Sequence, residues 1–218
     1  MAPWTTSLGP SARRHFALKA VGITGFMTLF FVAYFHLLNH PIRPVTAMPL
    51  TVVDRALPFV PAALPLYLSL WVYVSLPPTL IADRRALERY GAAIGLVCVA
   101  GLACFLLWPT AVPAMVLDWQ DFPGSAVLQG IDAAGNACPS LHVATAVFSA
   151  VWLDRQLRAF AAPASVRAAN GLWGAGIVLS TMLTRQHVFL DAAAGTALGL
   201  LGAGLLAAWE ARRASAAA

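Results

Sequence analysis

The chain has 218 residues, of which 60% are hydrophobic and only 11% are charged. This charged fraction is about half of what soluble domains carry, and so few polar side chains could not cover a surface in water. The composition therefore excludes a water-soluble globular protein. The net charge of +5 does not indicate nucleic-acid binding, because the basic residues lie in the connections between apolar segments.

Six apolar segments are long enough to predict membrane spans, in chain order 18–38, 59–81, 91–108, 141–154, 170–184 and 188–208. The first resembles a signal peptide, but it ends in HLLNHP instead of a small-residue cleavage site, so we expect it to be retained. The second contains four prolines, which membrane helices tolerate when neighbouring groups satisfy the freed carbonyls. The fourth is short, and we expect it to extend to about Leu157.

These segments predict an all-α fold, a polytopic membrane protein with six transmembrane helices in one bundle. Residues 1–17 are expected to form a cytoplasmic N-terminal segment, residues 18–210 the membrane domain, and residues 211–218 a cytoplasmic tail. No soluble domain and no long-period repeat is evident in the sequence.

The distribution of Lys and Arg predicts the orientation. One side of the predicted topology has only Arg43, Arg55 and Arg185, and the other side has all the remaining Lys and Arg residues of the 14 in the chain. By the positive-inside rule, both termini are cytoplasmic and the first, third and fifth connections face outward. The third connection, about 109–140, has no basic residue. We therefore expect a protein of the cytoplasmic (inner) membrane.

The cysteines predict neither a disulfide framework nor a metal site. Cys98 and Cys104 lie inside an apolar run, where cysteine behaves as a small hydrophobic residue. Cys138 is the single cysteine of a connection.

Two histidines are expected at the same outer face. His142 lies in the first turn of the fourth span, and His187 lies at the start of the sixth. The chain crosses the membrane twice between them, which returns His187 to the side and depth of His142. A lone histidine in such a place is often only an amphipathic residue at the interface. A pair at one face favours a shared site.

Asp191 follows His187 by four residues, a spacing that places both side chains on one face of a helix. A carboxylate there can fix the tautomer of the imidazole and leave its other nitrogen free as nucleophile or base. One histidine could then attack phosphorus while the other protonates the leaving oxygen. Two alternatives stay open, a His–Asp hydrogen bond that only joins two helices, and a zinc site formed by His187, Asp191 and His142.

Two motifs carry a resemblance to a known family. CPSLH at 138–142 and STMLTRQHVFLD at 180–191 resemble the second and third motifs of the type 2 phosphatidic acid phosphatase superfamily. The PSLH form is similar to the branch that contains inositol phosphorylceramide synthases. The resemblance covers the chain from about residue 50 onward and implies a six-helix membrane fold and a phosphohistidine mechanism, with no metal and no cofactor.

The resemblance also implies roles for individual residues. His187 is expected to be the nucleophile, and Asp191 to orient it. His142 is expected to be the general acid and later the base. Ser140 and Arg185 are expected to bind the substrate phosphate.

The sequence departs from the family pattern at two places. Ser180-Thr181 stand where the third motif has Ser-Arg, and the stretch WPTAVPA at 108–114 lacks the lysine and Arg-Pro of the first motif. Phosphoryl transfer depends on positioning and on charge stabilisation, so other cations would have to replace these. Arg185, Arg55 and Arg43 are on the outer side and could do so.

The expected function is an integral membrane phosphatase that hydrolyses a phosphomonoester or pyrophosphate lipid at the outer face. The same residues would serve a phosphotransferase that moves a phospho-head group to an alcohol acceptor. The missing first-motif cations instead favour a catalytically weak member that binds lipid or acts as a scaffold. The expected partners are a lipid phosphate substrate and membrane lipids, and not nucleic acid.

Overall fold

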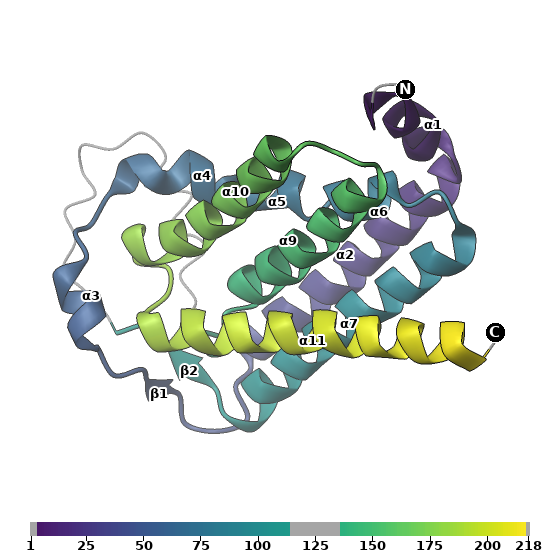
Figure 1. Ribbon diagram of the computed structural model, residues 1–218. Coiled ribbons are helices and arrows are strands. Elements are labelled where there is room, and N and C mark those ends of the chain that lie inside the picture. The colour runs from purple at the N-terminus through teal and green to yellow at the C-terminus, as the bar shows by residue number, and fades with distance from the viewer. Residues whose placement is uncertain (1–3, 114–135, 217–218) are drawn as a thin grey trace.

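The computed structural model describes residues 4–113 and 136–216 and shows a mostly helical protein (Figure 1). The long helices are α2 (Phe16–Asn39), α7 (Arg84–Leu107), α9 (Leu141–Ala159), α10 (Ala164–Leu183) and α11 (Phe189–Ala216). The short elements are η1 (Trp4–Ser7), α1 (Leu8–Arg13), α3 (Val52–Ala56), η2 (Pro61–Ala63), α4 (Leu64–Leu68), α5 (Leu70–Tyr73) and α6 (Leu76–Leu80). Strands β1 (Thr46–Ala47) and β2 (Thr110–Ala111) pair in parallel.

Four helical segments within the described residues are long and apolar enough to cross a membrane. They are Phe16–Asn39, Pro61–Leu80, Arg84–Leu107 and Phe189–Arg213. The structure therefore agrees with an all-α membrane protein. The spans predicted at 141–154 and 170–184 correspond to α9 and α10, which are helical but are not among these four segments.

The second predicted span, 59–81, is a series of short helical pieces and not one continuous helix. η2, α4, α5 and α6 follow one another with interruptions at Ser69 and at Val74–Ser75. Proline has no N–H group to donate to the carbonyl four residues earlier, and its ring crowds the preceding turn. Pro77 and Pro78 therefore account for the interruption at Val74–Ser75.

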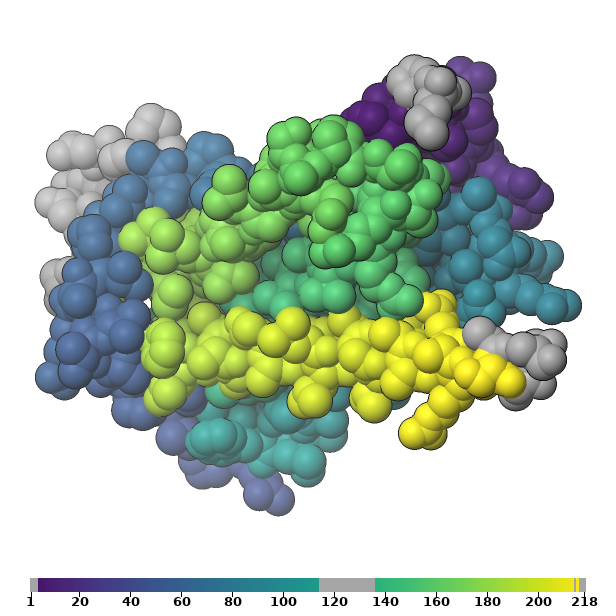
Figure 2. Space-filling model, viewed as in Figure 1, coloured from purple at the N-terminus to yellow at the C-terminus, as the bar shows by residue number. Residues whose placement is uncertain are grey.

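Helix α9 is the centre of the fold. It lies between α10 and α11 (Figure 1), and side chains of these two helices close over much of it (Figure 2). Val143, Ala144, Ala146 and Phe148 have no exposed surface. A helix surrounded by other helices meets little lipid, so it can carry polar residues such as the buried Ser149. This position explains why α9 is less apolar than the outer helices.

The contact between α9 and α11 is close because α11 has glycines where the two helices cross. An added Cβ at Gly195 would collide with the carbonyl oxygen of Ser140, and one at Gly199 with that of Ala144. Small residues four apart allow helix backbones to approach in membrane proteins. This glycine pair therefore sets the distance between α9 and α11.

The bundle has two different ends. α1 and the C-terminal part of α11 lie at one end, and α3, β1 and β2 at the other (Figure 1). At the first end Arg155 pairs with Glu210 at 3.1 Å, and Arg167 with Asp154 at 2.8 Å. Helices α9 and α11 continue beyond the predicted spans into this charged region, to Ala159 and Ala216. The expected extension of the fourth span to about Leu157 is close to the end of α9, whereas the sixth predicted span, 188–208, stops before the end of α11.

The glycine contact predicts a large effect of Gly199→Val on stability. The valine would push against the backbone of α9, and overpacking of this kind costs about 1–3 kcal/mol. The melting temperature of the purified protein in detergent should fall clearly. The matched control is Gly204→Val on the same helix, because an added Cβ at Gly204 meets nothing within 4 Å. Equal melting temperatures for both variants would contradict the proposed role of Gly199 at the crossing.

Candidate active site

The first part of the site is the N-terminus of α9. Ser140 is the N-cap, and its side-chain oxygen accepts a hydrogen bond from the Val143 N–H at 3.2 Å. Ser, Thr, Asp and Asn are favoured at this position because their oxygens satisfy a free N–H group of the first turn. The cap fixes the beginning of the helix and brings His142, which is half-buried, into its first turn.

The second part is the turn between α10 and α11. The N–H groups of Gln186 and His187 both donate to the carbonyl of Thr181, at 3.0 and 3.1 Å. Arg185 has φ = 58°, a left-handed conformation that costs a non-glycine residue about 1–2 kcal/mol. This tight turn directs the chain from α10 into α11 and places His187 just before the first turn of α11.

A backbone hydrogen bond joins these two parts. The N–H of Ser140 donates to the carbonyl of Asp191 at 3.0 Å. The Asp191 side chain has no exposed surface, and its Oδ2 accepts from the Val188 N–H at 3.1 Å. The start of α9 and the start of α11 are thus fixed to each other at Asp191.

The result is that His142, His187 and Asp191 come together. The ring centroids of the two histidines are 6.4 Å apart. Nδ1 of His187 lies 3.5 Å from Oδ2 of Asp191, within ion-pair range but without the geometry of a hydrogen bond. Catalytic hydrogen bonds are often long before substrate binds. Because Asp191 faces Nδ1, the nitrogen that remains for chemistry is Nε2 of His187.

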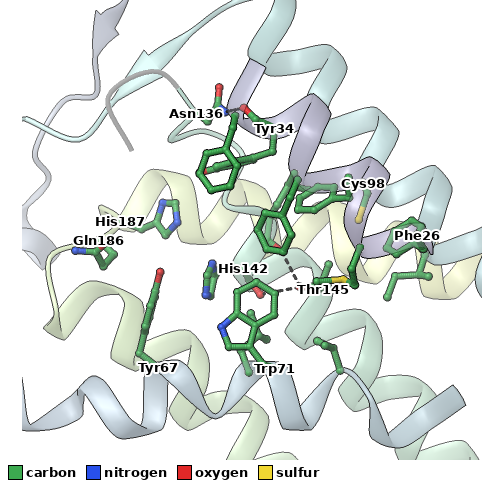
Figure 3. A pocket seen from close by; sticks show the side chains of 18 residues that line it. Phe26, Tyr34, Tyr67, Trp71, Cys98, Asn136, His142, Thr145, Gln186 and His187 are labelled. Atoms are coloured by element: carbon green, nitrogen blue, oxygen red, sulfur yellow. Dashed lines mark hydrogen bonds between the residues drawn. The ribbon is translucent and has the colours of Figure 1, made fainter. Parts of the chain in front are cut away.

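Aromatic side chains hold His142 in place. The ring of Tyr67 stacks on it, with centroids 4.4 Å apart and 13° between the planes, and Trp71 meets it edge-on at 5.6 Å. Figure 3 shows His142 between these two rings, with His187 and Gln186 beside it. Nε2 of His142 is buried and has no hydrogen-bond partner among the described residues. It is therefore free to exchange a proton with a bound ligand.

The histidines open onto a cavity of about 270 Å³. Its walls come mainly from α2, the α4–α5 segment, α7 and α9, and most of its lining is aromatic or aliphatic (Figure 3). The polar side chains near the histidines are Asn136, Thr145 and Gln186. No Lys or Arg is among the described residues that line this cavity.

Ser140 and Arg185, the two residues predicted to bind phosphate, have other contacts. Ser140 Oγ accepts the capping hydrogen bond, which leaves its hydroxyl hydrogen available as a donor. The Nη1 and Nη2 atoms of Arg185 donate to the carbonyls of Asp54 and Leu57, at 2.8 and 2.6 Å. The Nε of Arg185 is buried and has no hydrogen-bond partner among the described residues. Arg43 and Arg55, the other two cations expected to replace those of the first motif, are exposed.

Asp54 is a residue that the sequence did not single out. It is 3% exposed, and its carboxylate accepts hydrogen bonds from Thr51 N, Thr51 Oγ1 and Phe189 N, each at 2.7 Å. The bond to Phe189 satisfies a free N–H group at the start of α11, where Val188 has no side-chain oxygen to act as a cap. Asp54 thus connects the first loop to the segment that carries His187 and Asp191.

The pKa of Asp54 is lowered from its ordinary value. Burial favours the neutral acid, but the hydrogen bonds from Thr51 and Phe189 and the positive charge of Arg185 favour the carboxylate more strongly. A carboxyl group with a depressed pKa stabilises the fold above its ordinary pKa, and this stabilisation is lost as the pH falls through the lowered pKa.

Asp54→Asn should therefore destabilise the protein at neutral pH by about 2 kcal/mol, because hydrogen bonds to a charged acceptor become bonds to a neutral one. The melting temperature of Asp54→Asn should differ most from that of the wild type at pH 7, and the difference should become smaller below about pH 4. Asp83→Asn is the control, because Asp83 is an exposed N-cap of α7 and Asn caps equally well. A pH-independent difference for Asp54→Asn would contradict the role of its charge.

Among residues 4–113 and 136–216, no group of three His, Cys, Asp or Glu side chains has an arrangement that could hold a metal ion. The zinc alternative for His142, His187 and Asp191 gains no support from this geometry. The chemistry of the site is that of two imidazoles and one carboxylate at the end of an apolar cavity, within a mostly helical membrane protein.

The sequence model of the PAP2 superfamily matches residues 36–205, and the chain belongs to this superfamily. Its members are phosphatases or phosphotransferases, which supports an enzyme of that general kind. No curated protein and no solved structure matches the chain significantly.

Proposed function

We propose that this protein is a lipid-phosphate phosphatase that works through a phosphohistidine on His187. The observation that carries the proposal is the position of His187 between its two partners. Asp191 lies 3.5 Å from Nδ1, and the ring of His142 lies 6.4 Å away across the cavity. Membership of the PAP2 superfamily supports phosphoryl chemistry at this site.

In the proposed reaction, Nε2 of His187 attacks phosphorus and the bond from phosphorus to the leaving oxygen breaks. His142, which takes up a proton with the bound phosphate, gives that proton to the leaving oxygen. A water molecule then attacks the phosphohistidine, His142 takes a proton from the water, and the P–N bond breaks to release phosphate. Asp191 holds the His187 ring and stabilises its positive charge.

Binding of the phosphate is proposed for Ser140, through its hydroxyl hydrogen, and for Arg185. The guanidinium of Arg185 is held by two carbonyls, and its Nε is the donor left for an anion. The free N–H groups at the start of α9 add a positive field at the same place.

We further propose that α9 and α10 also cross the membrane, which gives six spans. The site would then face the outer side of the cytoplasmic membrane. In support, the ion pairs of Glu210 and Asp154 with arginines lie at the end of the bundle opposite the site. Basic residues at that end favour the cytoplasm, with both termini there.

His187→Ala should reduce phosphate release at least about a thousandfold, because the attacking nitrogen is lost. Asp191→Asn should keep part of the activity, since it removes the charge that orients the ring and not the nucleophile. The measurement is release of phosphate from lipid phosphates in detergent, with rapid denaturing quench to trap labelled phosphohistidine. The control His40→Ala changes an exposed histidine at the end of α2 and should leave both signals intact.

Other results would lead to other functions. A trapped phosphohistidine that yields a phosphorylated alcohol when an acceptor is added, in place of free phosphate, would indicate the phosphotransferase alternative. Loss of activity with EDTA and recovery with zinc would favour a metal site. No turnover by the wild type with any lipid phosphate would favour the lipid-binding alternative.

The topology gives a separate prediction. A reporter fused after Arg213 should be cytoplasmic, and an epitope tag inserted after Ile42, in the exposed loop beside the site, should be accessible from outside intact cells. The reason is the concentration of basic residues at the end of the bundle that carries α1 and the end of α11. A tag after Ile42 that is accessible only after permeabilisation would overturn the outer-face assignment.

A further inference from the structure

The cavity at the histidines adjoins a second cavity of about 530 Å³. This second cavity lies between α2, α6 and α7 and extends toward the end of the bundle that carries α1. The two cavities share five lining residues, Phe26, Met27, Trp71, Val74 and Ile94. We call the combined space the α2–α7 groove.

The lining of the groove fits a hydrocarbon chain. Most of its side chains are aliphatic or aromatic, and the glycines Gly22 and Gly91 line its second half. The one lysine there, Lys19, donates to the carbonyls of Ser11 and Thr79, both at 2.7 Å. Glu88 pairs with Arg84 at 2.8 Å. Neither charge is therefore free to hold a head group at that end.

The polar end of the groove is the end at the histidines. His142, His187 and Gln186 lie there together with Asn136 (Figure 3). Trp71 stands where the two cavities meet, with its ring 5.6 Å from His142 and 5.5 Å from Phe31. A molecule with one polar end and one long apolar end thus has only one orientation that matches the groove.

We propose that the α2–α7 groove binds the hydrocarbon tail of the substrate, and that the substrate is a long-chain lipid phosphate whose tail passes Trp71 and reaches Gly22 and Gly91. This inference rests on the proposed function for the position of the phosphate. Along α2, Tyr34 in the first cavity and Gly22 in the second are about 18 Å apart, at 1.5 Å per residue. A short chain ends in the first cavity, and a long chain fills both.

The test uses substitutions that narrow the second half of the groove. An added Cβ at Gly22 or at Gly91 meets nothing within 4 Å, so Gly22→Leu and Gly91→Leu fit the fold and place their side chains where the tail would lie. Gly25→Leu is the matched control, because Gly25 is on the same helix, has equally open space around it and does not line the groove.

The measurement is kcat/KM for phosphate release from hexadecyl phosphate and octyl phosphate. In Gly22→Leu and Gly91→Leu, kcat/KM for hexadecyl phosphate divided by kcat/KM for octyl phosphate should fall about tenfold or more. The reason is that several methylene groups of the long chain lose their apolar contact. The ratio should be unchanged in Gly25→Leu. An unchanged ratio in all variants, or an equal fall in Gly25→Leu, would overturn the proposal and indicate that bulk membrane lipid fills the groove.

A binding experiment separates this inference from the proposed function. A hexadecyl phosphonate with a photoreactive group at the chain end cannot be hydrolysed, and it should crosslink to the Leu18–Met27 part of α2, less so in Gly22→Leu. Crosslinking to this part of α2 without any turnover of substrates would refute the proposed phosphatase activity but support tail binding in the α2–α7 groove. Turnover of substrates with crosslinking at another place would support the phosphatase activity but refute tail binding in the α2–α7 groove.

Discussion

The close crossing of α9 and α11 is the contact on which the rest of the site depends. Gly195 and Gly199 let the two backbones approach, and the Ser140 N–H then reaches the carbonyl of Asp191 at 3.0 Å. His142 is two residues from one end of that hydrogen bond, and the carboxylate that faces His187 belongs to the residue at its other end. Small residues in a helix interface therefore determine the distance between two reactive rings.

A second constraint is the scarcity of positive charge at the site. The cavity has no Lys or Arg in its described lining, and Arg185 is already bonded to two carbonyls. The groups close to the histidines are instead neutral donors and the start of a long helix, whose free N–H groups carry partial positive charge.

The sequence was sufficient to predict the helical class of the fold and to predict that His142, His187 and Asp191 lie close together. Period-four spacing relates His187 to Asp191, and two crossings of the membrane return the chain to His142. Asp54 could not be predicted, because its bond to Phe189 joins positions 135 apart in a loop without regular spacing. Tyr67 and Trp71 were missed for a similar reason, since the prolines break their segment and obscure which face meets α9. The end of α11 was missed because the helix continues into an ion-paired region that composition does not assign to the span.

The position of α9 has a consequence for how the protein is made. During synthesis α9 leaves the ribosome before α10 and α11, the helices that later enclose it. Until α11 arrives, the Ser140 N–H lacks its acceptor, and the glycine surface that fits against α9 does not yet exist in the membrane. The reactive centre is therefore assembled by the last helix described, and a growing chain in the membrane carries His142 for some time without its partners. Assembly order thus brings His142, His187 and Asp191 together only when the bundle is closed.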